Sequence, residues 1–352
     1  MDALRSEFPV LERVAFLNTG TDGPVPTRAV AAAREALDDQ LREGRYGPHF
    51  ETRFALQAEL RDAYARVLGC TAEDVALTTS TSEGLGAVLG GLDLGPGDEI
   101  VTSDSEHPGL IGPLTAARGR GVSVKAVPLQ QIPDAVGPRT TLVACSHVSW
   151  VTGEVAPAAL ADLDVPVVLD GAQGAGAIPV DVRALGCAAY AASGQKWLCG
   201  ADGTGMLYLD PAFGEHVRVP APSWVSFQDT KRGLDSPLHT GARRFDTPSL
   251  AREAVAFSLA SARLLESVDD RHGRAARLAA RLAGALTEGG RTVAPRGETT
   301  LVSWDDADAV ATRDRLAAAG VVIRDLPGRD LLRASVGAWN DDSDLERLLS
   351  AL

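Results

Sequence analysis

Short apolar runs rich in Val, Leu and Ala alternate with amphipathic segments along the first two thirds of this 352-residue chain. The runs DVALTT, DEIVTS, VSVKAVPL, TTLVACSHV, VPVVLD, CAAYAAS and GMLYLD have the length of strands. The segments TRAVAAAREALDDQLREG, ETRFALQAELRDAYARVLG, SEGLGAVLGGL, HPGLIGPLTAARGRG and APAALADL are helical in pattern. Buried strands separated by helices are typical of a mainly parallel sheet covered on both faces, so the pattern predicts an α/β fold.

After about residue 250 the chain changes to long helical patterns and three further apolar runs. SLAREAVAFSLASARLLESV, GRAARLAARLAGALTEGG and DDSDLERLLSAL predict helices, and TTLVSW, VVIRD and LLRASVG predict strands. We expect a large domain over residues 15–245 and a smaller α/β domain made of residues 1–14 and 246–352. The irregular segment from Arg218 to Arg244 lies at the end of the first pattern, and loops of this length are usually functional. We expect it to shape the substrate pocket.

Charge and cysteine usage exclude several classes of function. The net charge of −13 disfavours binding to nucleic acid, whose phosphates an acidic surface repels. The first residues, MDALRSEFPVLERV, lack the apolar core of a secretory signal, and no apolar run has the length of a membrane span. The four cysteines are far apart without a CxxC pair, which argues against a metal site or disulfides and suits a reducing compartment. We therefore expect a cytoplasmic protein with no metal.

Lysine is scarce in this chain. Of the 34 basic residues only Lys125, Lys196 and Lys231 are lysines. An amine can lose its proton and attack a carbonyl carbon, which a guanidinium group cannot do. Lys125 lies in the alternating run VSVKAV and Lys231 in a polar turn, whereas Lys196 lies in SGQKWLCG between two apolar runs. Lys196 is therefore the lysine expected to react.

Ligands of open α/β sheets bind beyond the carboxyl ends of the strands, so the polar residues after each apolar run are the first candidates for a site. Four runs lead into such residues: Ser80 to Glu83, Glu106 and His107, Asp170 and Gln173, and Gln195 and Lys196. Alone, each has an ordinary structural explanation; Ser80 and Glu83 fit a capping box, and His107 precedes Pro108 at a helix start. Together, an acid, a hydroxyl-rich helix start, an imidazole and an amine at one rim suit a phosphorylated, nitrogen-containing aldehyde cofactor.

The stretch VVLDGAQGAGAIPVDVRALGCAAYAASGQKWLCGADGTGMLYL resembles the class V aminotransferase family, which includes cysteine desulfurases, isopenicillin-N-epimerase-like proteins and related pyridoxal phosphate (PLP) lyases. The resemblance extends in order through FLNTGTDGPVP, TSTSEGLGAVLGGL, LGPGDEIVTSDSEHPG, HVSWVTGEVAP, RRFDTPSLA and LLRASVGAW. It implies PLP fold type I, with a mainly parallel seven-stranded sheet in the large domain. It also implies a homodimer with a shared active site and an amino-acid substrate.

The resemblance also assigns roles to residues around the cofactor. Lys196 resembles the Schiff-base lysine that also moves the Cα proton, and Asp170 resembles the acid that pairs with the pyridine nitrogen. Gln173 resembles the partner of the phenolic oxygen, and His107 the imidazole that stacks on the ring. The residues that match the phosphate site are Thr81, Ser82, Ser193, Gln195 and, donated by a second subunit, Thr247. The substrate-binding residues implied are Arg333, which resembles the arginine that grips the substrate carboxylate, Trp150 and Asn18.

Three departures from the family pattern bear on the reaction. Gln195 stands where many desulfurases have His, and Trp150 stands where they usually have Asn. Desulfurases also take sulfur on a mobile cysteine in the small domain, and this chain has no cysteine after Cys199. Asp325, Leu326 and Pro327 occupy the loop where such a cysteine is expected, and Cys199 is too near Lys196 to serve.

We therefore predict a PLP-dependent C–S lyase of the β-elimination type that works without a persulfide cysteine. An aminotransferase or an amino-acid epimerase on the same scaffold remains an alternative, because all three reactions share a Cα carbanion. A catalytically silent PLP-fold protein is a further alternative. The retention of Lys196, Asp170 and Arg333 argues against it.

Overall fold

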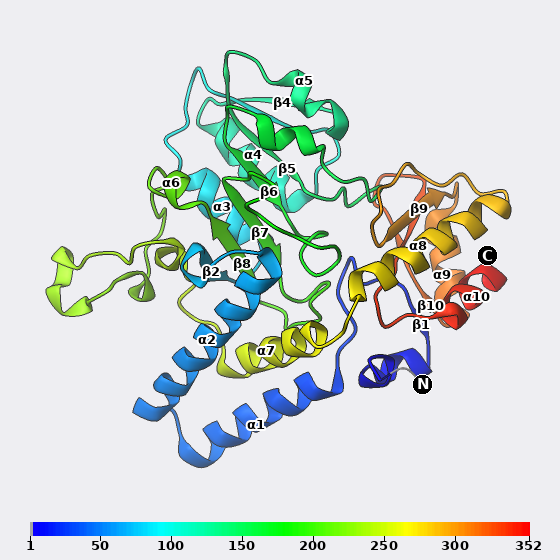
Figure 1. Cartoon of the computed structure of the whole chain (residues 1–352), viewed down its shortest axis with the longest axis horizontal. Helices are drawn as coiled ribbons and strands as arrows, with labels where there is room; N and C mark the ends of the chain where they lie inside the picture. The colour runs from blue at the N-terminus through cyan, green and yellow to red at the C-terminus, as the bar shows by residue number, and fades with distance from the viewer. Residues whose placement is uncertain (1–2) are drawn as a thin grey trace.

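The structure, a computed structural model, describes residues 3–352 and has a seven-stranded sheet at its centre, in the order β2-β8-β7-β6-β5-β3-β4 (Figure 1). The strands are β2 (Val75–Thr78), β3 (Glu99–Ser103), β4 (Ser123–Val127), β5 (Thr140–Ser146), β6 (Val167–Asp170), β7 (Ala189–Ser193) and β8 (Gly205–Leu209). Strands β4, β3, β5, β6 and β7 are parallel, which confirms the predicted mainly parallel sheet. β8 is antiparallel to both β7 and β2, because residues 194–204 contain no crossover helix to return the chain.

Helices cover both faces of this sheet. The helices are α1 (Thr27–Glu43), α2 (Gly47–Leu68), α3 (Thr81–Gly91), α4 (Pro108–Gly119), α5 (Ile132–Ala135), α6 (Pro211–Gly214), α7 (Arg252–Glu266), α8 (Arg271–Glu288), α9 (Ala309–Ala318) and α10 (Asp342–Ala351). Helices α3 and α4 pack on one face, and α2 and α7 contribute to the core on the other. Successive strand residues point to opposite faces, so Val168 joins the core under α3 and α4 while Leu169 joins the other core.

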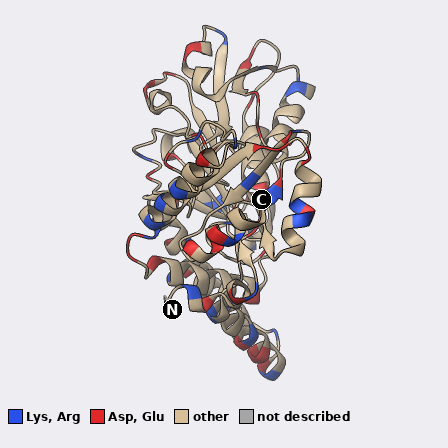
Figure 2. Ribbon diagram, turned by 90° about the vertical axis from the view of Figure 1, so that its right-hand side faces the viewer, with Lys and Arg blue, Asp and Glu red and all other residues tan. Residues whose placement is uncertain are grey.

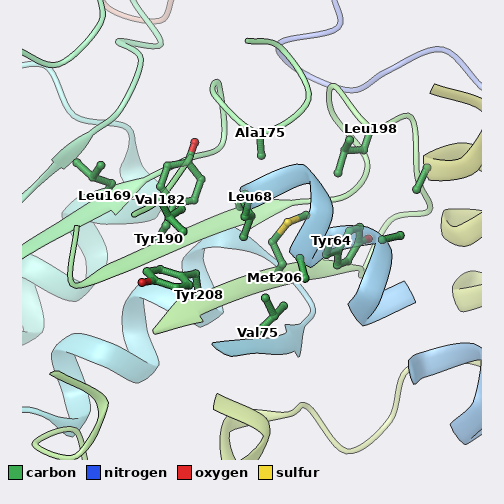
Figure 3. Packing of buried hydrophobic residues seen from close by; sticks show 14 of the residues in the cluster. Tyr64, Leu68, Val75, Leu169, Ala175, Val182, Tyr190, Leu198, Met206 and Tyr208 are labelled. Atoms are coloured by element: carbon green, nitrogen blue, oxygen red, sulfur yellow. The ribbon is translucent and has the colours of Figure 1, made fainter. Parts of the chain in front are cut away.

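The core beneath α2 is shown in Figure 3. Tyr64 and Leu68 from α2 lie against Met206 and Tyr208 from β8, with Tyr190 from β7 beside them. The exposed fraction of each of these five side chains is 3% or less. The strands that carry the predicted site residues are therefore anchored in a close-packed interior.

The C-terminal part forms a second, smaller sheet. Strands β9 (Leu301–Asp305), β11 (Arg324–Asp325) and β12 (Leu331–Ser335) are antiparallel in the order β11-β12-β9. Near it, β1 (Ala15–Phe16) pairs in parallel with β10 (Val321–Val322), and Asn18 forms a bridge with Ser335. Residues 15–18 thus pair with C-terminal strands, and α7 packs against α1 and α2. The domain boundaries at residues 14 and 245 stay a prediction.

Three local predictions were wrong. APAALADL forms a short 3-10 helix (Ala158–Asp162), and VVIRD is divided between β10 and β11. Cys187 lies before β7 rather than within a strand. In each case a single apolar run predicts one regular element, whereas the structure shortens or divides that element.

The ribbon in Figure 2 shows positions of Lys and Arg and positions of Asp and Glu distributed over many elements, in keeping with an acidic charge that is spread along the chain. Within residues 3–352 no helix is both long enough and apolar enough to cross a membrane.

Candidate active site

The predicted phosphate-binding hydroxyls meet where β7 ends and α3 begins. The Thr81 backbone N–H donates to Ser193 Oγ over 3.1 Å, and the two hydroxyl oxygens are 2.7 Å apart. Ser80 caps α3 by accepting from the Glu83 N–H, as expected. The Glu83 carboxylate accepts from Thr79 instead of from Ser80, so the predicted capping box is only half formed. The first N–H groups of α3 and two hydroxyl groups thus surround one spot, an arrangement that favours an anion.

Ser82 and Gln195 lie at the edges of this spot. A Cβ atom on Gly109 would be 2.7 Å from Ser82 Oγ and 3.2 Å from His107 Nδ1, so the serine and histidine side chains converge on the start of α4. The Gln195 amide has no hydrogen-bond partner within residues 3–352, and its Oε1 is buried. Both side chains keep polar groups available for a ligand at the end of β7.

Lys196 and Asp170 come from neighbouring strands. Asp170 is the last residue of β6, 5% exposed, and pairs with Ala191 of β7, while Lys196 follows β7 by three residues. Burial lowers the pKa of Lys196, and the charge on Asp170 opposes this shift while Arg333 adds to it. Burial raises the pKa of Asp170, against the charge of Lys196 and a hydrogen bond from the Ala172 N–H. The lysine is thus shifted towards the neutral amine that a nucleophile requires.

Gln173 is held more firmly than the sequence suggested. Its Nε2 donates to the Gly20 carbonyl over 2.8 Å, and its Oε1 accepts from Trp197 Nε1 over 2.9 Å. Gln173 is 5% exposed. Its amide orientation is therefore fixed by two neighbours, and one Nε2 proton remains for a ligand.

His107 caps α4 and stands edge-on to Trp150. The His107 Nδ1 accepts from the Gly109 N–H over 3.1 Å, so the proton of the neutral ring is on Nε2. The His107 and Trp150 rings are 5.2 Å apart at 87°, and Trp150 Nε1 donates to the Ser105 carbonyl. Burial and the charges of Lys196, Arg324 and Arg333 lower the pKa of His107 to about 4. The imidazole is therefore neutral near pH 7.

Arg333 is buried and largely unpaired. It is 1% exposed, and Nη1 donates to the Trp150 carbonyl over 2.6 Å, but Nε and Nη2 have no hydrogen-bond partner among residues 3–352. A Cβ atom on Gly20 would be 2.9 Å from Arg333 Nη2 and 2.8 Å from Ser335 Oγ. Asn18, which accepts from Thr21 over 2.8 Å, bridges to Ser335. Buried N–H groups without partners favour a ligand with a carboxylate at this point.

Two charged residues of the site escaped prediction. Arg324 lies directly opposite Arg333 in the β11–β12 pair, and its charge lowers the pKa of Arg333, which burial already lowers, to about 9. Asp22 interacts electrostatically with both Lys196 and Arg324. The sequence predicted VVIRD and LLRASVG as strands, but their pairing, which places Arg324 opposite Arg333, is a finding of the structure.

Glu106, which the sequence placed at the rim without a role, is a buried carboxyl group behind Asp170. It is 5% exposed and accepts from Ser146 N over 2.9 Å and from Ser146 Oγ over 2.5 Å. Ser146 lies opposite Asp170 in the β5–β6 pair. Burial, with a contribution from the Asp170 charge, raises the pKa of Glu106 to about 7.

Thr247 does not join the other predicted phosphate ligands in this chain. Its N–H donates to the Leu77 carbonyl over 2.9 Å, and the cavities it lines also contain Thr78, Glu83 and Asp246 but none of the residues Thr81, Ser82, Ser193 or Gln195.

The segment from Arg218 to Arg244 projects from the large sheet in Figure 1 and packs through Trp224 on Phe54. Its cavities contain neither Lys196 nor Asp170. The expectation that this segment shapes the substrate pocket stays a prediction.

The described residues fit pyridoxal phosphate. The α3 N-terminus with Thr81 and Ser193 offers donors for a phosphate, and Lys196 offers an amine for the aldehyde. Asp170 offers a buried carboxylate for the ring nitrogen. Within residues 3–352 no cluster of His, Cys, Asp and Glu is arranged to hold a metal ion.

The comparisons with known proteins identify the family. The aminotransferase class-V family model matches residues 16–294. A cysteine desulfurase of Klebsiella pneumoniae (strain 342) is 32% identical over 234 residues, covering 59% of this chain and 57% of the relative. An isopenicillin N epimerase of Amycolatopsis lactamdurans is 29% identical, covering 99% of this chain and 96% of the relative. The cystine C–S lyase C-DES, in complex with its reaction product cysteine persulfide, has a TM-score of 0.92 at 27% identity, covering 97% of this chain and 98% of that one.

The chain therefore belongs to the aminotransferase class V family and has the fold of PLP fold type I enzymes. It is a PLP-dependent enzyme of that family, related to cysteine desulfurases and isopenicillin N epimerase. The alignments with the first curated relatives span 55–57% of the relatives' length.

Proposed function

We propose that the protein is a PLP-dependent C–S lyase that cleaves the Cβ–S bond of a cysteine derivative and releases the sulfur fragment without a protein persulfide. The observation that carries the proposal is the position of Leu326, in the loop where desulfurases have their cysteine. Leu326 is 1% exposed, packs with Trp150 and Val151, and its N–H donates to the Leu331 carbonyl over 2.9 Å. The segment is thus a closed hairpin with an apolar anchor.

The cysteines of the chain support the same proposal. Cys145, Cys187 and Cys199 are buried and Cys70 is partly buried. Burial raises the pKa of the Cys70 and Cys187 thiols to about 12 and holds those of Cys145 and Cys199 well above the usual value. Because the thiolate is the nucleophile in sulfur transfer, none of the four thiols suits that task near pH 7.

The residues at the rim divide the work of β-elimination. PLP, when bound, supplies an acceptor for the electron pair left at Cα. Arg333 binds the substrate carboxylate, Lys196 removes the Cα proton, and Asp170 keeps negative charge beside the ring nitrogen. The Cβ–S electron pair leaves with sulfur, which takes up a proton. With one water consumed, the products are a thiol or persulfide, pyruvate and ammonia.

Epimerisation is the second candidate, favoured by the end-to-end similarity to isopenicillin N epimerase. It uses the same removal of the Cα proton by Lys196 and differs in that a proton returns to the opposite face. The Trp150 ring is edge-on to His107, and the Trp150 carbonyl accepts from Arg333. We expect contacts between Trp150 and the substrate to decide between elimination and epimerisation.

We further propose a cytoplasmic homodimer in which Thr247 reaches the partner's phosphate site. The support is that Thr247 lies away from its own chain's phosphate site. Several large apolar side chains are also exposed on α1, on α2 and the residue before it, and on the 218–244 segment: Leu37, Leu41, Tyr46, Phe50, Trp224 and Leu234. An exposed apolar surface of this kind is typical of an interface.

Product analysis tests the proposed reaction. The PLP-loaded protein is given cystine, cysteine and S-methylcysteine, and pyruvate, alanine, sulfur products and exchange of the Cα proton with deuterated water are measured. A lyase produces pyruvate in step with the sulfur product, and Lys196→Ala abolishes it. Deuterium at Cα without pyruvate identifies the epimerase. Alanine with a persulfide on one of the four cysteines overturns the proposal.

A further inference from the structure

Lys196 begins a tight turn that ends in a strained residue. The Cys199 N–H donates to the Lys196 carbonyl over 3.0 Å and closes the turn, and Cys199 has a φ of 49°. This left-handed conformation is unfavourable for a residue with a Cβ atom and is adopted mainly by glycine. Backbone strain of this kind persists only where neighbouring structure holds it. The turn that carries the reacting amine therefore depends on its surroundings.

Helix α7 supplies a contact to the strained residue. The Ser261 hydroxyl donates to the Cys199 carbonyl over 2.7 Å, and both residues are buried. A hydrogen bond in a buried environment of low dielectric is stronger than the same bond in water. The bond joins residues 62 positions apart, so it exists only in the folded protein. It holds the Cys199 peptide group in the orientation that the left-handed conformation gives it.

The loop at residues 20–23 packs on the same turn. The Gly23 N–H donates to the Gln195 carbonyl over 2.8 Å. A Cβ atom on Gly23 would overlap the Lys196 carbonyl oxygen and lie 2.8 Å from Cys199 Sγ. The backbone of this loop therefore touches both ends of the turn and leaves no room for it to shift in that direction.

The two side chains between Lys196 and Cys199 are anchored as well. Trp197 Nε1 donates to Gln173 Oε1 over 2.9 Å, and Leu198 lies in the core beneath α2 (Figure 3). These contacts fix the middle of the turn through its side chains. The contact with Ser261 differs from them because it acts on the backbone at the strained residue.

We propose that Ser261 is a positioning residue for Lys196. By holding Cys199 in its left-handed conformation, Ser261 fixes the direction in which the Lys196 side chain leaves the turn. The Ser261 side chain acts through Cys199 and needs no contact with PLP or substrate. The inference goes beyond the proposed C–S lyase function, because an amine placed for PLP is needed whichever reaction follows.

The surroundings of the Lys196 amine make its position measurable. Burial lowers the pKa of Lys196. Four charged groups also act on the amine, two acids that oppose this shift and two arginines that add to it: Asp170, Asp22, Arg333 and Arg324. If the turn relaxes, the amine spends part of its time outside this environment, and its pKa rises towards the ordinary value. A change in stability alone does not produce this rise.

The test measures the amine in the cofactor-free protein. Competitive labelling with acetic anhydride over a series of pH values gives the pKa of each lysine, with the exposed Lys125 and Lys231 as internal standards. The rate at which the protein takes up PLP, followed by absorbance, is the second readout. Neither readout depends on the substrate or on the reaction catalysed, so failure of the lyase proposal leaves the test intact.

Ser261→Ala removes the hydroxyl donor, and Ser258→Ala is the matched control. Ser258 is also buried on α7, but its hydroxyl contacts Ala201 and Thr204, which follow the turn. Urea unfolding is measured for both variants, because each loses a buried hydrogen bond and is expected to lose stability. Only Ser261→Ala is expected to change the pKa of Lys196.

Two substitutions of Cys199 separate backbone strain from the sulfur atom. Cys199→Gly and Cys199→Ala both remove the thiol, but only glycine adopts the left-handed conformation without strain. Each is made alone and together with Ser261→Ala. If Ser261 acts by holding a strained residue, Cys199→Gly removes most of the effect of Ser261→Ala, and Cys199→Ala leaves that effect unchanged.

We expect Ser261→Ala to raise the pKa of Lys196 and to slow PLP uptake by about two- to tenfold, the range that loss of one neutral hydrogen bond gives. An unchanged pKa of Lys196, an equal change in Ser258→Ala, or equal rescue by Cys199→Ala and Cys199→Gly overturns the assignment. If Ser261→Ala does not fold, Ser261→Cys, whose thiol is a weak donor, takes its place with the same expected results.

Discussion

Replacing Glu106 with Gln isolates the electrostatic effect of burying a carboxyl group behind the proposed cofactor site. The side chain keeps its shape, its oxygen can still accept from the Ser146 N–H, and its amide can donate to Ser146 Oγ. The substitution removes an ionisable carboxyl group that is buried, at 5% exposure, and close to the charge of Asp170. The variant therefore changes charge with little change in packing.

The magnitude follows from the pKa. Burial raises the pKa of Glu106 from 4.5 to about 7, so between these values the folded protein binds a proton that the unfolded chain has released. The free energy of unfolding therefore falls as the pH rises through this interval, and this decrease is complete above the pKa that Glu106 has in the folded protein. A difference of about 2.5 units at about 1.36 kcal/mol per unit gives about 3 kcal/mol.

The assay is urea unfolding of the cofactor-free protein at about pH 5 and about pH 8.5, because bound PLP adds its own pH dependence. Wild type is compared with Glu106→Gln and with Glu215→Gln, an exposed control. We expect the free energy of unfolding of Glu106→Gln to rise relative to wild type by about 3 kcal/mol between the two pH values. Parallel pH profiles for the two proteins would refute the reasoning. An equal gain in Glu215→Gln would assign the effect to net charge.

Three further predictions concern the site. Lys196→Ala abolishes covalent attachment of PLP, and borohydride reduction of wild type labels one peptide, which contains residue 196; a label on the exposed Lys125 or Lys231 would contradict this. Asp170→Asn lowers kcat more than it lowers PLP affinity, because an adjacent charge shifts a pKa, here that of the cofactor's ring nitrogen, by about one to three units. An unchanged kcat would count against this role of Asp170. Gly20→Ala places a Cβ atom 2.8 Å from Ser335 Oγ and 2.9 Å from Arg333 Nη2, so kcat/KM falls about tenfold or more, whereas Gly112→Ala, which meets open space, leaves it close to wild type.

Much of the sheet could be predicted because its strands are continuous apolar runs. β6 and β7 are buried on both faces, so VPVVLD and CAAYAAS contrast sharply with the polar residues that follow. The same contrast placed Asp170 and Lys196 at one edge, since carboxyl ends of parallel strands meet there. The direction of β8 could not be read in this way, because an apolar run has the same pattern in either direction.

Side-chain contacts between residues far apart in the chain could not be predicted from the sequence. Gln173 is fixed by Gly20 and Trp197, and Arg324 by Thr21, which is 303 positions away in the chain. No local pattern signals such contacts, because they arise only when the N-terminal segment packs between the two sheets. Family likeness identified Arg333 from its own motif, but a second arginine opposite it depends on the register of β11 and β12.

The hairpin that carries both arginines also bears on the reaction. A cysteine that takes sulfur must approach the substrate and then leave, so its loop must change position. Here Leu326 is anchored by Trp150 and by its hydrogen bond to Leu331, and this anchoring keeps Arg324 opposite Arg333. A loop that moved at Leu326 would lose the fixed spacing of the two guanidinium groups. We infer that a fixed arginine pair and a mobile cysteine arm are alternative uses of this hairpin, and that this chain has the first.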